Sequence, residues 1–124
     1  MNVQIENLNS KFNTLIESEL KTFDEVSLMK NIMGVYIIYN CENEIIYIGS
    51  TNKFNIRFGT DLKHESTHTL VSKLIKSGSF EDRYQVKDYL KTKCSIRIEI
   101  CETKREAEAL EHIAIFVLEP SLNK

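Results

Sequence analysis

The sequence is poor in the residues that interrupt or cross-link a fold. It has no tryptophan, one proline and four glycines among 124 residues, which excludes a fibrous or low-complexity chain. Its three cysteines, Cys41, Cys94 and Cys101, show no C-x-x-C spacing, so neither a disulfide framework nor a zinc knuckle is indicated. We therefore expect reduced thiols, a cytoplasmic protein and one main domain with its own core.

Long apolar runs and an excess of basic charge are also missing. No segment approaches the ~18 consecutive apolar residues of a membrane span, and the first residues lack the basic and then apolar pattern of a signal peptide. Membrane association and secretion are therefore not expected. The formal net charge is −2, so the whole-chain value alone gives no sign of nucleic-acid binding.

The first third of the chain predicts helices followed by a hairpin. Apolar residues at steps of three and four predict an amphipathic helix over residues 5–23. Thr22 and Glu25 form a capping-box pattern for a second short helix that ends at Gly34. The β-branched and aromatic runs Gly34–Tyr39 and Glu44–Gly49 predict two strands, both central in a sheet, joined by a short polar loop.

The remaining residues predict more helices and a third strand. Helices are expected at about 55–63 and 67–77, while residues 81–92 fit either a helix or a loop. Alternation over residues 94–101 predicts a strand with one buried face that contains Ile96, Ile98 and Ile100, and a Thr103–Glu106 capping box opens a final helix to about Leu118. The fold class is therefore α/β (α+β), a small sheet of about three strands covered by helices.

Glu111 is the residue that this fold explains least. It shares a helix face with small apolar residues that should point at the sheet. Burying an unpaired carboxylate costs on the order of several kcal/mol, so such a group is normally paired or bound to a metal. The alternatives are an ion pair with Arg57 or Arg97, or a position at the wet rim of the core.

Other candidate residues lie in and after the hairpin. Tyr36 and Tyr47 stand on the two strands, where tyrosines usually serve packing. Gly49 takes a strand position that normally carries a side chain, which suggests close approach of backbone or ligand. Arg57 is either a solvent-facing charge or a phosphate ligand, and the nearby histidines either do nothing particular or transfer protons.

Together these residues form an ordered motif. The sequence has GVY at 34–36, YIG at 47–49 followed by Ser50, Arg57 eight residues after Gly49, and Glu111 before a closing P-x-x-N. This pattern resembles the GIY-YIG nuclease family over roughly residues 33–124, with GVY in place of GIY. The resemblance implies a GIY-YIG endonuclease-like domain at 34–124, with a three-stranded antiparallel sheet flanked by helices. It also implies a metal-dependent phosphodiesterase that acts on DNA, and leaves residues 1–33 as an N-terminal helical extension packed on the core.

The resemblance also assigns roles. It implies that Glu111 binds one divalent cation, Mg²⁺ or Mn²⁺, which suits a site built from oxygen atoms. Tyr36 would accept a proton from the attacking water, Tyr47 would hold that water or a phosphate oxygen, Arg57 would support the scissile phosphate, and Asn123 would shape the site. The predicted substrate-binding residues are Gly49, Ser50, Lys53, Lys63, Lys73 and Asn123.

The family histidine has two candidate matches in this sequence. Many members carry it about four residues after the arginine, whereas His64 and His68 follow Arg57 by seven and eleven residues. We favour His68 as the catalytic histidine, because it stands just ahead of a predicted helix, as in some homing-type members.

The expected partner is DNA, single- or double-stranded. Residues 57–97 carry nine basic and five acidic side chains, net +4, which predicts weak, salt-sensitive binding on one face. The N-terminal helices would cap the core or form a homodimer, and a partner protein is another possible source of specificity. The alternative function is a non-catalytic nucleic-acid-binding or protein-interaction module on the same fold.

Overall fold

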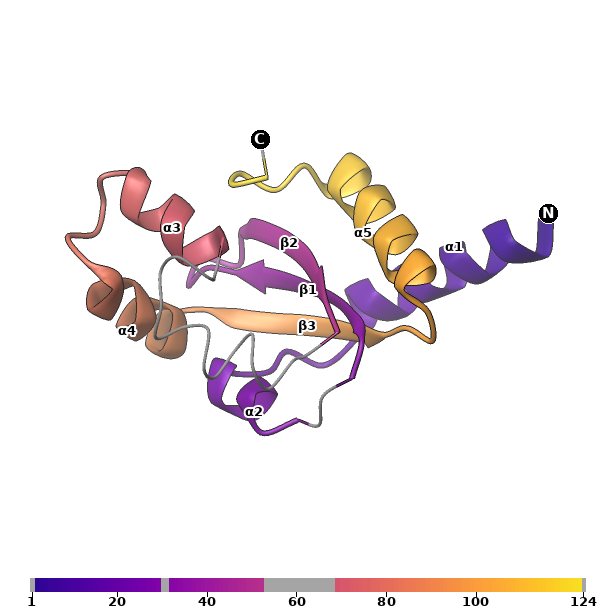
Figure 1. Ribbon diagram of the computed structural model, residues 1–124, viewed down its shortest axis with the longest axis horizontal. Coiled ribbons are helices and arrows are strands. Elements are labelled where there is room, and N and C mark those ends of the chain that lie inside the picture. The colour runs from indigo at the N-terminus through magenta and orange to yellow at the C-terminus, as the bar shows by residue number, and fades with distance from the viewer. Residues whose placement is uncertain (1, 30–31, 53–68, 124) are drawn as a thin grey trace.

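The computed structural model describes residues 2–29, 32–52 and 69–123 (Figure 1). The expected helix at 55–63 lies outside these residues. The elements, in chain order, are α1 (Asn2–Glu17), α2 (Phe23–Ser27), β1 (Gly34–Tyr39), β2 (Ile45–Thr51), α3 (Thr69–Lys76), α4 (Arg83–Lys93), β3 (Ser95–Ile100) and α5 (Lys104–Leu118).

The three strands form one antiparallel sheet in the order β2-β1-β3. This confirms the predicted fold class. The prediction that both hairpin strands are central was wrong for β2, which is an edge strand. Its outer edge is covered by the end of the chain, where the Leu122 N–H donates to the Ile46 carbonyl at 2.8 Å. The apolar run in β2 therefore reflects helices over the sheet faces and not a strand on each side.

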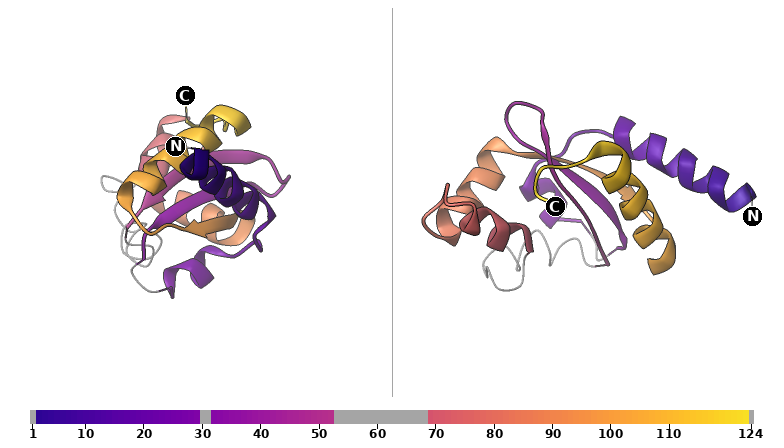
Figure 2. Two further views of the ribbon diagram at one scale, coloured as in Figure 1. Left: turned by 90° about the vertical axis from the view of Figure 1, so that its right-hand side faces the viewer. Right: turned by 90° about the horizontal axis from the view of Figure 1, so that it is seen from above.

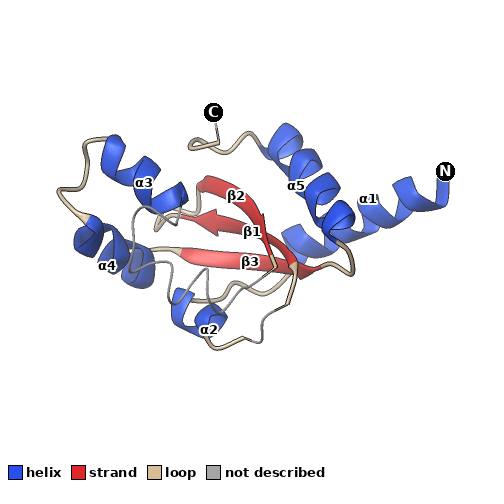
Figure 3. Cartoon of the chain, viewed as in Figure 1, coloured by secondary structure: helices blue, strands red, loops and turns tan. Residues whose placement is uncertain are grey.

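Helices cover both faces of the sheet, as Figures 2 and 3 show. Val35 and Ile37 of β1 pack with α1 and α5, whereas Tyr36 and Ile38 pack with α2, α3 and α4. Because successive strand residues point to opposite faces, both sets are buried. This accounts for the unbroken apolar sequence of β1.

The N-terminal helices are shorter than the sequence predicts. α1 ends at Glu17, because the backbone of Lys21 pairs with Ile96 on the free edge of β3 through two hydrogen bonds of 2.8 Å. A residue that pairs with a strand cannot continue a helix. The Thr22–Glu25 capping box is present and starts α2, which ends at Ser27, well before Gly34.

The later helices agree better with the sequence. Residues 81–92, which fitted either structure, form α4 with Asp82 as the N-cap. In α5 the Thr103 side chain accepts a hydrogen bond from the Glu106 N–H, as predicted. The Glu106 carboxylate, however, accepts from the Glu102 N–H, so its half of the predicted capping box is displaced by one residue.

β3 has one buried face, as predicted, with Ile96 and Ile98 in the core, and α1 packs against its other, half-buried polar face. The Nζ atom of Lys11 in α1 lies 3.4 Å from Oε2 of Glu99 and donates a hydrogen bond to the Ile100 carbonyl oxygen at 3.0 Å. The Arg97 guanidinium donates to the Tyr39 hydroxyl at 3.2 Å and to the Ser18 carbonyl. Ile100, expected in the core, is half exposed at the end of the strand.

Candidate active site

Tyr36 and Tyr47 lie side by side on the sheet face that α3 covers. Their ring centroids are 6.2 Å apart, and both side chains are buried, with 3% and 9% of their surface exposed. The Tyr36 ring lies over its cross-strand partner, Gly49. The hairpin therefore brings together the two phenols that the motif singles out.

Gly49 is required by the approach of the Tyr36 ring. A Cβ atom at this position would lie 2.5 Å from the Tyr36 hydroxyl oxygen and 3.1 Å from Cε2 of Tyr47. The first of these distances is one that real Cβ atoms essentially never show, so a side chain at this position would force the Tyr36 ring to shift. The close approach inferred from the sequence thus comes from neighbouring side chains.

Gly49→Ala is expected to lower the free energy of unfolding by about 1–3 kcal/mol, because the added methyl must displace a buried ring. Urea denaturation measures this loss. A double-mutant cycle with Tyr36→Phe tests the cause, since the closest contact is with the hydroxyl oxygen. The double variant should lose less stability than the sum of the single losses, and simple additivity would contradict this explanation.

Glu111 is held from the opposite side of the same strand. Ser50 follows Gly49 and pairs with Val35, so it faces α5, where its hydroxyl donates a hydrogen bond to Oε1 of Glu111. The carboxylate is half-buried. The partner that the structure gives it is therefore a hydroxyl, whereas Arg97, one of the two arginines considered, bonds to Tyr39 and Ser18.

The oxygen atoms at Glu111 suit a hard divalent cation. Within the described ranges, no group of three or more His, Cys, Asp or Glu side chains could hold a metal on its own. A single carboxylate still fits Mg²⁺, which keeps several waters and takes further ligands from a phosphate substrate. The residues present thus fit a cation that is completed by water and substrate.

Asn123 fixes the edge of β2 beside this site. Its Oδ1 accepts a hydrogen bond from the Ile48 N–H at 2.7 Å, and its Nδ2 donates to the Ile48 carbonyl at 2.8 Å. The side-chain amide thus pairs with β2 as a neighbouring strand would. It does so one residue before Gly49, so Asn123 holds the backbone next to the glycine that lies under the tyrosine rings.

Asn123→Ala is expected to cost about 1–3 kcal/mol of stability, the sum of two hydrogen bonds at ~0.5–1.5 kcal/mol each. Faster hydrogen exchange of the Ile48 amide would place the loss at the β2 edge. Ser121→Ala, a change of an exposed side chain in the same segment, serves as the control. Unchanged exchange at Ile48 in the Asn123 variant would show that these bonds do not hold the edge.

Lys73 of α3 lies against the tyrosine side of the site. Its Nζ atom donates to the Leu122 carbonyl at 2.6 Å and lies 5.6 Å from the centre of the Tyr47 ring. The other predicted residues between β2 and α3, namely Lys53, Arg57, Lys63, His64 and His68, lie outside the described residues.

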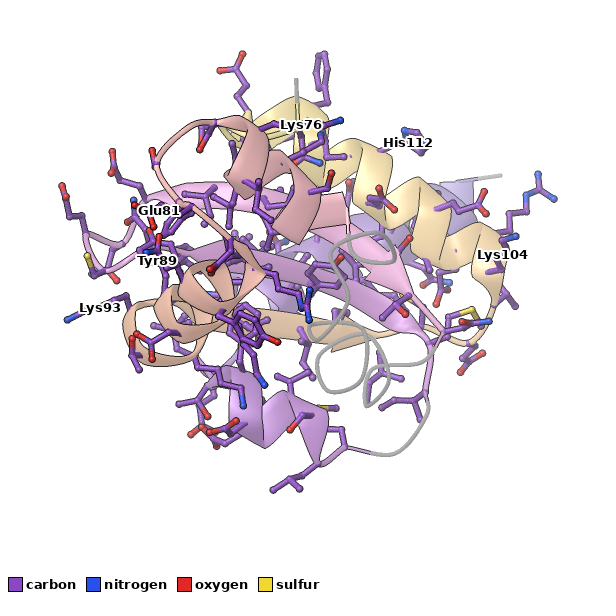
Figure 4. The ribbon with its side chains drawn as sticks, turned by 60° about the vertical axis from the view of Figure 1, so that its left-hand side comes forward. Lys76, Glu81, Tyr89, Lys93, Lys104 and His112 are labelled. Atoms are coloured by element: carbon purple, nitrogen blue, oxygen red, sulfur yellow. The ribbon has the colours of Figure 1, made fainter. Side chains whose placement is uncertain are left out.

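The other titratable groups of the described chain do not extend this site. His112 follows Glu111 but is exposed on the outer side of α5 (Figure 4). Burial raises the pKa of Cys94 to about 11, and burial together with Glu106 does the same for Cys101. Both thiols are therefore protonated at pH 7 and unsuited to nucleophilic chemistry.

The basic residues of the middle segment that the structure describes do not all lie on one face. Arg97 lies under α1, and Lys91 pairs with Asp24 of α2 at 3.3 Å. In Figure 4, Lys76 lies at the top of the view and Lys93 at its left edge. A continuous basic surface formed by all of the expected residues is therefore not what the described part of the chain shows.

A family comparison agrees with the geometry. The model of the GIY-YIG catalytic domain matches residues 32–123. The chain belongs to the GIY-YIG family. This match leaves α1 and α2 outside the family domain, although Leu15 of α1 is fully buried against its core.

Solved structures with the same fold include GIY-YIG nuclease domains. The N-terminal endonuclease domain of UvrC from Thermotoga maritima, bound to magnesium as its catalytic divalent cation, is 20% identical. The match covers 82% of this chain and 93% of that one, with a TM-score of 0.55. Two point mutants of the same domain, one tyrosine to phenylalanine and one asparagine to alanine, match with 20% identity, 82% and 92% coverage and a TM-score of 0.55. At this identity the likeness shows the fold.

Two other comparisons were negative. No curated protein sequence matches this GIY-YIG chain significantly. In the described part of the chain, no helix has the length and apolar character needed to cross a membrane.

The GIY-YIG motif did not indicate the contacts that two of these residues make in the structure. The hydroxyl of Ser50 donates a hydrogen bond to Glu111, which the motif did not indicate, and its role in binding substrate stays a prediction. The period-2 alternation of β2 already places Ser50 on the face opposite Gly49, so this contact could have been inferred once α5 was assigned to that face. The contact of Lys73 with Leu122 has no signal in the sequence, since it joins residues far apart in the chain.

Proposed function

We propose that this GIY-YIG domain is a metal-dependent endonuclease that hydrolyses phosphodiester bonds in DNA. The observation that supports this most is the arrangement around two consecutive residues of β2. Gly49 faces Tyr36 and Tyr47, and Ser50 faces Glu111. Phenols and a carboxylate thus flank one strand end from its two faces.

Different side chains of the protein would have different roles in hydrolysis. Tyr36, fixed over Gly49, accepts the proton of the attacking water, and Tyr47 holds that water or a phosphate oxygen by a hydrogen bond. Glu111, oriented by its hydrogen bond from Ser50, would hold the cation. Mg²⁺, or Mn²⁺ in its place, would supply neutralisation of the charge that develops on the phosphate oxygens.

The proposal also includes residues outside the described ranges, whose roles follow from the family motif. Arg57 would support the scissile phosphate through its planar fork of donors. Lys53 and Lys63 would contact neighbouring phosphates, and His68 would act in proton transfer. An unperturbed phenol, with a pKa near 10, is a poor base at neutral pH. Tyr36 therefore needs a nearby positive charge, from the cation, Arg57 or Lys53, to stabilise its phenolate.

A cleavage assay separates this function from the alternative of a binding module. The purified chain is incubated with supercoiled plasmid or single-stranded oligonucleotide in Mg²⁺, Mn²⁺ or EDTA. We expect cleavage of at least one substrate with a divalent cation and none in EDTA. DNA that is bound in a mobility-shift assay but never cleaved in either metal would favour the binding module.

A further inference from the structure

Lys73 occupies a junction of three parts of the molecule. It belongs to α3, it donates to the Leu122 carbonyl of the C-terminal segment, and its ammonium lies over the Tyr47 ring of β2. The segment that it reaches is the one that carries Asn123 to the edge of β2. Lys73 therefore touches both structures that frame the tyrosine side of the site.

The surroundings of Lys73 differ from those of an exposed lysine that is available to bind a phosphate. The side chain is half-buried, and its hydrogen bond of 2.6 Å to a carbonyl is short, as expected for a charged donor. Lys76, three residues further along the same helix, is exposed (Figure 4). The two lysines thus provide a matched pair with different surroundings.

We propose that Lys73 is a positioning residue that acts through Tyr47, an inference that rests on the proposed role of Tyr47 in catalysis. A cation within about 6 Å of an aromatic ring is attracted to its face. A nearby positive charge also favours the ionised form of a phenol, which makes the neutral phenol a stronger hydrogen-bond donor. Lys73 holds the ring in place and strengthens the hydrogen bond that Tyr47 gives to water or phosphate.

The titratable groups around Tyr47 come from more than one element. Among the described residues, Tyr36 of β1 and Lys73 of α3 lie against its ring. The centre of the Tyr36 ring is 6.2 Å from the centre of the Tyr47 ring, and the Lys73 Nζ atom is 5.6 Å from it. Glu111 of α5 bonds to Ser50 on the other face of the sheet. Of these groups, Lys73 is the cation.

The test follows the titration of Tyr47 by NMR in protein labelled with ¹³C at tyrosine Cζ, without DNA or metal. Tyr47→Phe assigns the signal. Lys73→Gln removes the charge and retains a donor for Leu122, so we expect the Tyr47 midpoint to rise by about half a pH unit or more. Lys73→Arg should keep it close to the wild-type value, and Lys76→Gln is the control. An unchanged midpoint in Lys73→Gln, or an equal rise in Lys76→Gln, would overturn the proposal.

Kinetics distinguish positioning from direct binding of substrate. Lys73→Gln is expected to lower kcat about tenfold with KM nearly unchanged, and Lys73→Arg should restore most of kcat. A raised KM with normal kcat would instead show that Lys73 binds phosphate, and the proposal would be wrong. If the wild type cleaves no DNA, the proposed function fails, while the Tyr47 titration still decides whether Lys73 acts on this phenol.

Discussion

Glu111→Gln is expected to reduce the rate of DNA cleavage in Mg²⁺ by about a thousandfold or more, with the domain still folded. The amide keeps the size of the side chain and an oxygen that can accept the Ser50 hydrogen bond. It loses the negative charge that attracts the cation. A loss of ~4 kcal/mol of transition-state stabilisation, as expected when a catalytic metal is removed, corresponds to this factor.

Single-turnover cleavage at saturating Mg²⁺ measures this effect, and circular dichroism with thermal unfolding checks the fold. Glu108→Gln is the matched control, since Glu108 lies one turn earlier on α5, is exposed and pairs with Lys104 at 3.8 Å. Its activity should stay near that of the wild type. A Glu111→Gln variant within tenfold of the wild type would exclude a direct role for this carboxylate.

Tyr36→Phe is expected to lower the cleavage rate by about 10²–10⁴-fold, the usual contribution of a positioned acid or base. The substitution removes only the hydroxyl that would accept the proton. The ring itself is retained and can keep its packing over Gly49, so the variant is expected to stay folded. Activity and stability should therefore separate in this variant.

The pH dependence provides a second readout of Tyr36. If its phenolate is the base, the wild-type rate should rise with pH between 6 and 10, and Tyr36→Phe should remove the rise. Tyr84→Phe on α4, where the ring is 65% exposed, is the control for loss of a tyrosine hydroxyl. A wild-type rate that is flat over this range would argue against Tyr36 as the base.

The sequence predicted the centre of this fold better than its edges. β1 and its pairing with β2 follow from β-branched and aromatic residues in a run, a pattern that a strand covered on both faces produces. The same pattern could not show that β2 lies at an edge. Helices bury both faces of a strand whether it is central or at an edge, so the sequence does not reveal the strand order. The end of α1 was missed for a related reason, since Lys21 pairs with a strand about 75 residues later.

In the candidate site, too, the sequence predicted some features and missed others. Tyr36, Tyr47 and Gly49 were identified from the motif, and the antiparallel register brings them together. The partner of Glu111 was not identified, because the helical pattern shows only that Glu111 faces the sheet. Which strand residue it meets depends on how α5 is placed over β2, and that placement is a property of the folded chain.

The proposed function requires a divalent cation at Glu111, beside Ser50 at the end of β2. Titration of ¹⁵N-labelled protein with Mn²⁺ tests it directly, because the paramagnetic ion broadens the amide signals nearest to its site. We predict early, selective broadening at Glu111 and Ser50 that competes with Mg²⁺ and is lost in Glu111→Gln. Broadening that is absent there, or that persists in Glu111→Gln, would contradict this account of the site.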